Sequence, residues 1–446
     1  MNKSGIFDAI AVFPNAWKIE DLRKKILYVL MILFIYRIGA NMPLPGIDLS
    51  LWQLHRSGFG EAGLFGNTLF AAIAGGGFAT IFAMGIGPYI TASIIMQLLS
   101  VALPKLEQLK KEGEEGKKKM NQITKIIAII MAVLQGAGLV FSFNQMGLFV
   151  YPSFITYAIA MTSLVAGTIM VMWLGELITE KGIGNGTSFM IFSNILSALP
   201  GALVFLWTLA TNPGGEFDLA QAIQIGVIVL LAIVFFILIC MAILIQEGER
   251  RIPVQNSKKA AGGASHTGAN SSFIPIKVNI AGVMAIIFSL SILGFPAMLS
   301  GLTQNDTLDM IVSWLELTHP VGALLYMGLI IGFTFFYTSF AINPREMAEN
   351  LKKNGGFIPG IRPGVPTSEY IQRTVYRISW IGAISYVILA MVPIVFEVLI
   401  GFIPGIVPIT VGFGGSTLLI VTGVALELVK KLQSNMLTRH YKGFLE

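Results

Sequence analysis

The amino-acid sequence predicts an all-α membrane protein whose chain crosses the bilayer ten times. Three observations lead to this prediction. Hydrophobic residues make up 54% of the 446 residues and charged residues only 12%, whereas water-soluble domains carry about 25% charge. Apolar runs longer than about 17 residues, the minimum for a helix that crosses the hydrocarbon core, recur along the chain. Basic residues gather in alternate connections between these runs, as the positive-inside rule expects.

Ten runs qualify as spans. They cover about 24–40, 79–101, 123–143, 154–174, 187–209, 222–245, 278–299, 321–342, 378–397 and 407–428. The first resembles the apolar part of a signal peptide, but no small-residue cleavage site follows it, so we expect it to be retained. If both chain ends are cytoplasmic, all of the 30 Lys and Arg except Arg37 and Arg56 lie on the cytoplasmic side. A wrong number of spans would mix the two sides, so this distribution supports both the count and the orientation.

One apolar segment between the first two spans is too short to cross. Residues 64–76 reach only about 20 Å as a helix, and the glycines at 75–77 end it. Irregular backbone at membrane depth persists only inside protein or beside a watery cavity. We therefore expect this segment to re-enter the protein from the outside, the alternative being a helix that lies on the outer surface. From Ala79 we expect a full span that carries Pro88.

Two cytoplasmic connections are long, at 246–277 and 343–377. The middle of the first is rich in Gly, Ala and Ser, which favours a flexible connector. The second concentrates four glycines and two prolines around a single charge, Arg362. This pattern is compatible either with a shaped functional tip or with a solvated connector.

No motif of an enzyme or a metal site is present. The span interiors are nearly free of charge, and the four histidines lie in loops or in the C-terminal tail. There is no phosphate-binding GxxxxGK sequence and no helical HExxH, and "GIGNG" at 182–186 is interpreted as a loop that enters the fifth span. We therefore expect no catalysis, cofactor or metal, and any energy must come from a partner. Cys240, the single cysteine, is expected to face lipid or the protein core.

Uncharged polar residues do occur inside the spans, among them Gln97, Gln135, Asn194 and Ser291. Side chains of this kind commonly form hydrogen bonds between membrane helices. They either hold neighbouring helices together or line a seam that opens.

Five longer motifs resemble the SecY family, the central pore subunits of bacterial protein-translocation channels. In chain order they read "IGPYITASIIMQLL", "KKEGEEGKKKMNQ", "MWLGELITEKGIGNGTS", "IPIKVNIAGV" and "NPREMAENLKKNGGFIPGIRPG". The resemblance covers nearly the whole chain. It implies two inverted five-helix halves, residues 1–200 and 201–446, around an hourglass pore for unfolded secretory polypeptides. It also implies a lateral gate that releases transmembrane segments into the lipid.

The resemblance assigns roles to particular residues. Segment 64–76 corresponds to the plug that seals the outer funnel, with the residues Leu64, Phe65, Leu69, Phe70, Ala71, Ala72, Ile73, Ala74, Gly75 and Gly76. The constriction of the pore corresponds to Ile86, Ile90, Ile191, Ile287 and Ile420. A narrow ring of apolar, stiff, branched side chains sheds water and blocks ions. The gate would lie between spans 2 and 3 on one side and spans 7 and 8 on the other, with Gln97, Gln135 and Ser291 as candidate contacts.

The same resemblance implies partners. The long cytoplasmic loops correspond to docking sites for the SecA motor ATPase and the ribosome, with the residues Arg250, Arg251, Lys258, Lys259, Arg345, Lys352, Lys353 and Arg362. The last matches the essential arginine of the family, whose planar, charged fork suits carboxylates and phosphates. SecE- and SecG-like small membrane subunits, signal peptides, nascent chains and anionic lipids are the other implied partners, in a bacterial plasma membrane. The tip of the first loop, 260–272, departs from the family because it carries fewer basic residues.

Two other classes of function compete with a protein channel. A secondary transporter of a small solute needs charged residues at a midplane site, which the spans lack. A membrane insertase or scaffold without a pore needs neither a plug-like segment nor the five isoleucines.

Overall fold

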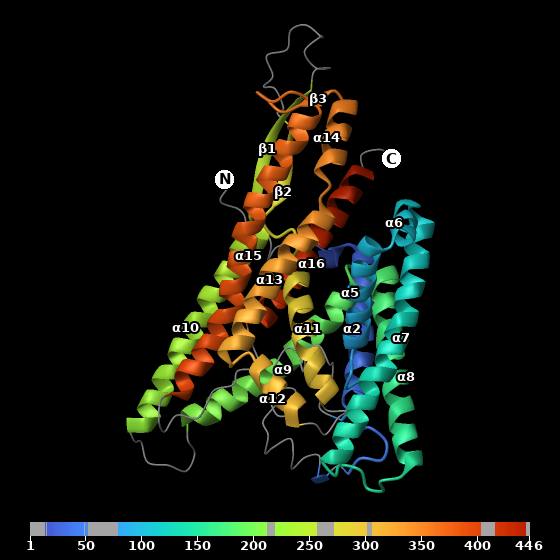
Figure 1. Cartoon of the computed structure of the whole chain (residues 1–446), viewed down its shortest axis with the longest axis vertical. Coiled ribbons are helices and arrows are strands. Elements are labelled where there is room, and N and C mark those ends of the chain that lie inside the picture. The colour runs from blue at the N-terminus through green and yellow to red at the C-terminus, as the bar shows by residue number, and fades with distance from the viewer. Residues whose placement is uncertain are drawn as a thin grey trace.

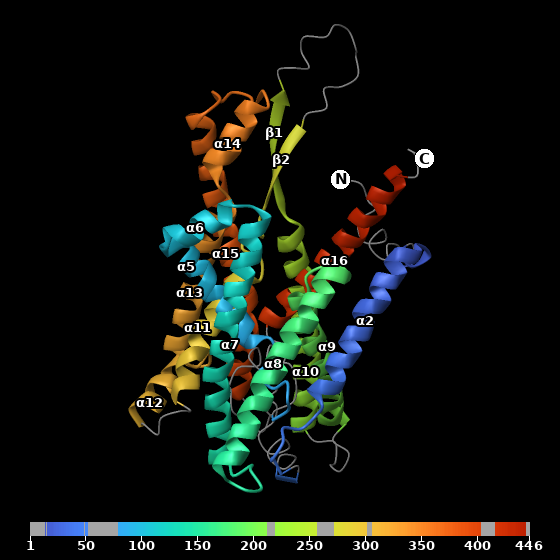
Figure 2. The same cartoon turned by 90° about the vertical axis from the view of Figure 1, so that its right-hand side faces the viewer.

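The structure, a computed structural model, describes residues 14, 16–48, 50–51, 79–211, 219–256, 272–300, 306–402 and 415–442. Figure 1 shows a bundle of long helices that run roughly along the longest axis of the molecule. In that view α7 and α8 lie on one side and α10 and α15 on the other, with α11 between them. Figure 2 shows a small sheet and α14 together at one end of the bundle, with α12 at the opposite end.

Each of the ten predicted spans overlaps a helix among the described residues, although 278–283 precede the helix of the seventh span and 407–414 of the tenth lie outside the described residues. These helices are α2 (Glu20–Ala40), α5 (Gly87–Ala102), α7 (Glu114–Gln145), α8 (Phe154–Lys181), α9 (Gly186–Thr211), α10 (Leu219–Glu247), α11 (Met284–Ser300), α13 (Pro320–Ala341), α15 (Val365–Gly401) and α16 (Gly415–Lys442). Six of them are long and apolar enough to cross a membrane by length and composition, and α5 and α11 are shorter apolar helices. Charges near the ends of α2 and α16 make these two helices less apolar overall.

The second span begins later than predicted. Residues 81–86 form consecutive turns, and the helix starts only at Gly87. Pro88 sits in the first turn of this helix, where its missing N–H is not needed. Ala79, which has a φ of +63°, is held by the backbone after α2, because its carbonyl accepts a hydrogen bond from the Leu44 N–H at 3.0 Å. The predicted helix start at Ala79 is therefore wrong.

Three short helices complete the helical part: α6 (Pro104–Lys111), α12 (Asp306–Leu315) and α14 (Pro344–Lys353). Several spans also extend beyond the predicted apolar runs at their predicted cytoplasmic ends. Helix α15, for example, begins at Val365 inside the second long loop. The interpretation of "GIGNG" as a loop that enters the fifth span is confirmed, since α9 begins at Gly186 and Gly184 has a φ of +92°.

The two long loops meet in one antiparallel sheet with the strand order β2-β1-β3. Strands β1 (Glu249–Asn256) and β2 (Ser272–Lys277) are the arms of the first loop and pair from Glu249 with Lys277 onward. Strand β3 (Gly356–Phe357) comes from the second loop and pairs with the end of β1. The prediction of a flexible connector is therefore wrong for the arms of the first loop, whereas its middle, 257–271, lies outside the described residues.

The main hydrophobic core lies at the centre of the bundle. One cluster of buried side chains joins residues from α2, α5, α8, α9, α10, α11, α13, α15 and α16. Many large apolar side chains on the outer surface are exposed instead, such as Phe236 and Leu244 on α10. A surface of this kind suits lipid, which carries no penalty for apolar contact. Cys240 is exposed on the same helix, in line with a lipid-facing position.

Candidate functional site: a central cavity

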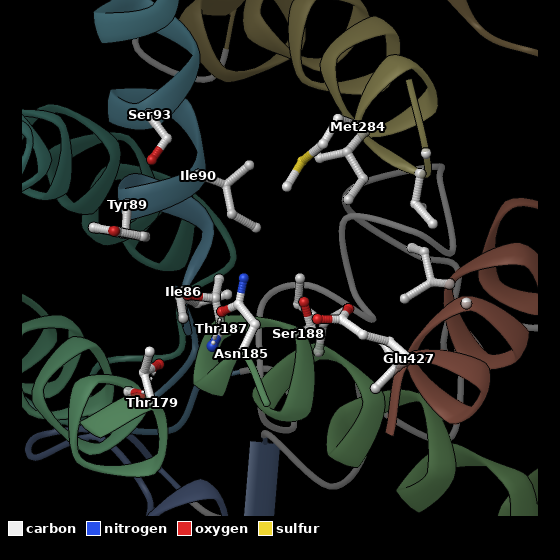
Figure 3. A pocket seen from close by; sticks show the side chains of 18 of the residues that line it. Ile86, Tyr89, Ile90, Ser93, Thr179, Asn185, Thr187, Ser188, Met284 and Glu427 are labelled. Atoms are coloured by element: carbon white, nitrogen blue, oxygen red, sulfur yellow. Dashed lines mark hydrogen bonds between the residues drawn. The ribbon is translucent and has the colours of Figure 1, made fainter. Parts of the chain in front are cut away.

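A cavity of about 1160 Å³ lies among the helices and is lined from both ends of the chain. Figure 3 shows side chains from α5, α8, α9, α11 and α16 around it, including Tyr89, Thr179, Met284 and Glu427. Residues separated by more than three hundred positions thus share one wall. A molecule inside the cavity would therefore contact residues from both the N-terminal and the C-terminal part of the chain.

The apolar part of the wall contains all five isoleucines named above. Ile86, Ile90, Ile191, Ile287 and Ile420 line the cavity, and each is buried and belongs to the central core cluster. Ile86 caps the N-terminus of α5, and the other four occupy the first two turns of α5, α9, α11 and α16. The local geometry explains their common location, because four helices start beside the cavity and each brings a branched side chain to it. That they form a constriction remains a prediction.

The rest of the wall is polar and charged. Lys118 and Lys125 on α7, Glu176 and Glu180 on α8, and Glu427, Lys430 and Lys431 on α16 all line the cavity. Lys125 Nζ lies 2.7 Å from Glu176 Oε1, and Lys430 Nζ lies 2.7 Å from Glu247 Oε1. These groups come from the predicted cytoplasmic ends of their helices. The wall therefore changes from charged near the predicted cytoplasm to apolar at the isoleucines.

The three candidate gate residues have different surroundings. Gln97 lines the cavity, and its buried Oε1 has no hydrogen-bond partner among the described residues. Gln135 is buried, and its Nε2 donates to Thr91 Oγ1 on α5 at 3.4 Å. This bond joins two helices on the same side of the predicted gate, and a contact across the gate stays a prediction. Ser291 lies half-buried on α11, which packs against both α5 and α7.

Asn194 forms a hydrogen bond between two helices, α2 and α9, which is the first of the two roles proposed for polar residues inside the spans. Its Oδ1 accepts a hydrogen bond from Tyr36 Oη at 2.7 Å, although the two residues are 158 positions apart in the chain. The sequence reasoning missed Tyr36 as a partner. It also missed Gln246, whose buried amide bonds to α16. The single sequence signal for Gln246 was a polar residue at the end of a long apolar run.

The structure describes six of the eight basic residues predicted to dock partners, and five of these six lie on β1 and α14, at the surface of one end of the molecule. Arg250 and Arg251 project from β1, and Arg345, Lys352 and Lys353 project from α14; all are exposed. Arg251 also pairs with Glu249, with its Nη2 2.5 Å from Oε1. Lys258 and Lys259, like the whole predicted plug 64–76, lie outside the described residues.

Arg362 is exposed in the turn between β3 and α15. Gly360 and Gly364 on either side have φ angles of +81° and +105°, a conformation that other residues rarely adopt. The carbonyl of Arg362 accepts a hydrogen bond from Thr367 Oγ1 at 2.9 Å. This geometry favours the shaped tip over the solvated connector.

A ten-helix bundle around a cavity with a charged rim and an apolar wall defines a polytopic membrane protein of the channel or carrier class. The comparisons with known proteins narrow this class. A family model described as SecY matches residues 80–429. The protein translocase subunit SecY of Streptomyces galbus is 41% identical, over 98% of this chain and 100% of the relative. The chain therefore belongs to the SecY family.

Two solved structures share the fold. A protein-conducting channel aligns with a TM-score of 0.62 at 18% identity, over 91% of each chain. Sec61 in a canine ribosome–channel complex aligns with a TM-score of 0.61 at 17% identity, again over 91% of each chain. At these identities the likeness concerns the fold, and it agrees with the ten-helix architecture.

Proposed function

We propose that the chain is the pore subunit of a protein-conducting channel, which passes unfolded secretory polypeptides across the membrane and releases transmembrane segments sideways. The observation that carries this proposal is the meeting of five isoleucines from the starts of four helices around the central cavity, in a chain of the SecY family. The charged part of the wall offers water and polar contacts to an unfolded chain. The apolar part supplies a seal.

The seal follows from the chemistry of the five side chains. A narrow apolar passage loses its water, and ions do not enter because they would have to shed their hydration shells. Isoleucine branches at Cβ and is therefore stiff at χ1, so a ring of such residues keeps its shape. A polypeptide can still pass, because its own apolar side chains replace the contacts that the ring loses.

Sideways release needs two halves that separate along one seam. Residues 1–200 and 201–446 are the proposed halves, and two of the contacts between their described helices bear on this separation. Helix α11 packs against α5 and α7 at one seam, whereas α9 packs against α10 and α16 at the other. We assign the lateral gate to the first seam, with Gln97 and Ser291 beside it, and the hinge to the second.

The loops at the sheet end serve as the docking platform. Strand β1 of the first loop pairs with β3 of the second, so a partner that binds there contacts both loops at once. A family relative of known structure is described in a ribosome–channel complex, which supports a ribosome as one partner. SecA and SecE- and SecG-like subunits complete the proposal, with signal peptides as ligands and anionic lipids around the channel. The platform faces the cytoplasm of a bacterial plasma membrane, as do both chain ends.

The ring is tested by replacing all five isoleucines with serine. We expect the variant to insert and assemble normally but to conduct ions at rest, because small polar side chains no longer exclude water. The measurement is single-channel conductance after reconstitution with the small subunits and the motor. Replacement of the same five residues with valine is the matched control, since valine is also apolar and branched, and it should preserve the seal.

A tight resting seal in the serine variant would show that the constriction lies elsewhere. Solute uptake by the unmodified protein without any polypeptide transport would instead favour a carrier.

A further inference from the structure

Each proposed half contains a buried polar contact between its first and its fifth helix. In the N-terminal half the donors are Tyr36 and Arg37, in the last turn or so of α2. Tyr36 Oη donates to Asn194 Oδ1 at 2.7 Å, and Arg37 Nη2 donates to the Ser193 carbonyl at 2.5 Å. Tyr36 is fully buried and Asn194 is 6% exposed. Both acceptors lie on α9, two and three residues after Ile191.

The C-terminal half has a corresponding contact. Gln246, the penultimate residue of α10, is 7% exposed. Its Nε2 donates to the Leu419 carbonyl at 3.0 Å and to Thr422 Oγ1 at 3.1 Å. Both acceptors lie on α16 and flank Ile420. In each half, therefore, the C-terminal end of the first helix is bonded to the stretch of the fifth helix that carries an isoleucine of the ring.

Packing supports both contacts. A Cβ at Gly423 would lie 3.4 Å from Gln246 Nε2, at van der Waals distance, so the amide packs directly on the surface of α16. The Tyr36 ring stacks on Phe82 with a centroid distance of 5.6 Å and an interplanar angle of 8°. A Cβ at Gly39 would lie 2.2 Å from the Phe82 ring. Phe82 precedes Ile86 by about one turn, so the N-terminal contact also supports a second isoleucine.

We infer that Tyr36 and Gln246 are positioning residues, each of which holds the isoleucine that the fifth helix of its half contributes to the ring. Removing the donor of such a contact removes the hydrogen bonds that join the first helix to the fifth, so the stretch that carries the isoleucine can shift. The contacts lie within the halves, so they persist while the seam at α11 opens. This inference rests on the proposed role of the ring. It predicts that each contact controls its own isoleucine and not that of the other half.

Cysteine labelling tests this half-specific control. In a background with Cys240→Ala, which removes the single native cysteine, Ile191→Cys or Ile420→Cys reports exposure to a membrane-impermeant maleimide. The complex is reconstituted with its small subunits in proteoliposomes. Both reporters should label slowly in this background, because Ile191 and Ile420 are 4% and 2% exposed.

The double variant Tyr36→Phe with Arg37→Met removes both N-terminal donors. It should raise the labelling rate at 191 several-fold and leave the rate at 420 unchanged. Gln246→Met, which keeps the length of the side chain but loses the donor, should do the reverse. Tyr157→Phe is the matched control, because Tyr157 Oη also donates to an asparagine, Asn144 Oδ1, at 2.6 Å. That pair joins α8 to the end of α7, and neither helix carries a reporter, so neither reporter should change.

Unchanged labelling in both the Tyr36→Phe/Arg37→Met variant and the Gln246→Met variant would overturn the inference, and so would an equal rise at both reporters. Neither result would contradict the proposed ring. An equal rise in the Tyr157→Phe control would also overturn it, since any loosened helix contact would then suffice. Rapid labelling of both reporters while both polar contacts are intact would show instead that these isoleucines do not form the ring. The inference would then also be rejected.

Discussion

At the scale of single residues, the floor of the cavity depends on a close approach of two helices. A Cβ at Gly186 would lie 1.8 Å from the carbonyl oxygen of Gly175, so α8 and α9 touch backbone to backbone there. Thr179 connects them further, because its Oγ1 donates to the Gly175 carbonyl and accepts from the Gly186 N–H, both at 2.9 Å. Ile191 follows less than two turns after Gly186. The position of Ile191 therefore depends on Gly186, because any side chain at 186 would push the two helices apart.

Gly186→Ala should destabilise the protein by about 1–3 kcal/mol or more, the usual cost of forcing an extra group into a packed site. Thermal unfolding of the purified protein in detergent measures this loss, and resting conductance should rise with it. Gly201→Ala on the same helix is the control, because no atom lies within 4 Å of a Cβ there. Equal melting temperatures for the two variants would contradict the close approach as the cause.

At the scale of secondary-structure elements, the two long loops form one surface. Strand β1 pairs with β2 along its length and with β3 near its end. Isoleucines pack beneath this sheet and against α15, among them Ile252, Ile276, Ile358 and Ile371. Helix α14 begins at a capped turn, in which Asn343 Oδ1 accepts from the Glu346 N–H at 3.4 Å. The turn with Arg362 projects from this supported platform and not from a free loop.

Arg362→Glu should lower motor-driven translocation about tenfold or more, which corresponds to about 1.4 kcal/mol or more of lost interaction. The substitution reverses a charge at the proposed docking surface, far from the isoleucines. Insertion, assembly with the small subunits and resting conductance should be unchanged. Arg362→Lys should restore activity only in part, because lysine keeps the charge but loses the planar fork.

Translocation in proteoliposomes measures this effect, and motor binding is measured alongside it. Wild-type transport by the glutamate variant would reject a docking role for Arg362. Normal motor binding with lost transport would move its role to a step after docking.

At the scale of the whole molecule, the frame around the predicted plug is described although 64–76 are not. Backbone hydrogen bonds join residues 42–44, before this segment, to residues 79–81, after it. The Leu44 N–H donates to the Ala79 carbonyl and the Ile81 N–H donates to the Met42 carbonyl, both at 3.0 Å. We therefore expect that the segment between them can be shortened without separating α2 from α5.

Deletion of 64–76 should leave the protein inserted and assembled but leaky to ions at rest. The physical reason is that this apolar segment is too short to span, and its burial in the outer funnel would block the pore. Conductance across vesicles provides the measurement, and thermal unfolding confirms that the frame survives. An unchanged resting conductance would favour a helix on the outer surface instead.

The sequence by itself determined the number of spans, because hydrophobicity over about twenty residues is a local property that does not depend on neighbours. It also determined the sharp turns beside Arg362 and Gly186, because glycine marks them locally. Patterning did not identify the isoleucines, since Ile191 or Ile420 on an apolar helix is equally at home in lipid or in a core; resemblance to a family pointed to them. Only the tertiary structure placed Tyr36 against Asn194 and β1 against β3, and moved the start of α5 to Gly87. Those contacts join segments far apart in the chain, and their free energy comes from packing and hydrogen bonds that exist only once the helices have assembled.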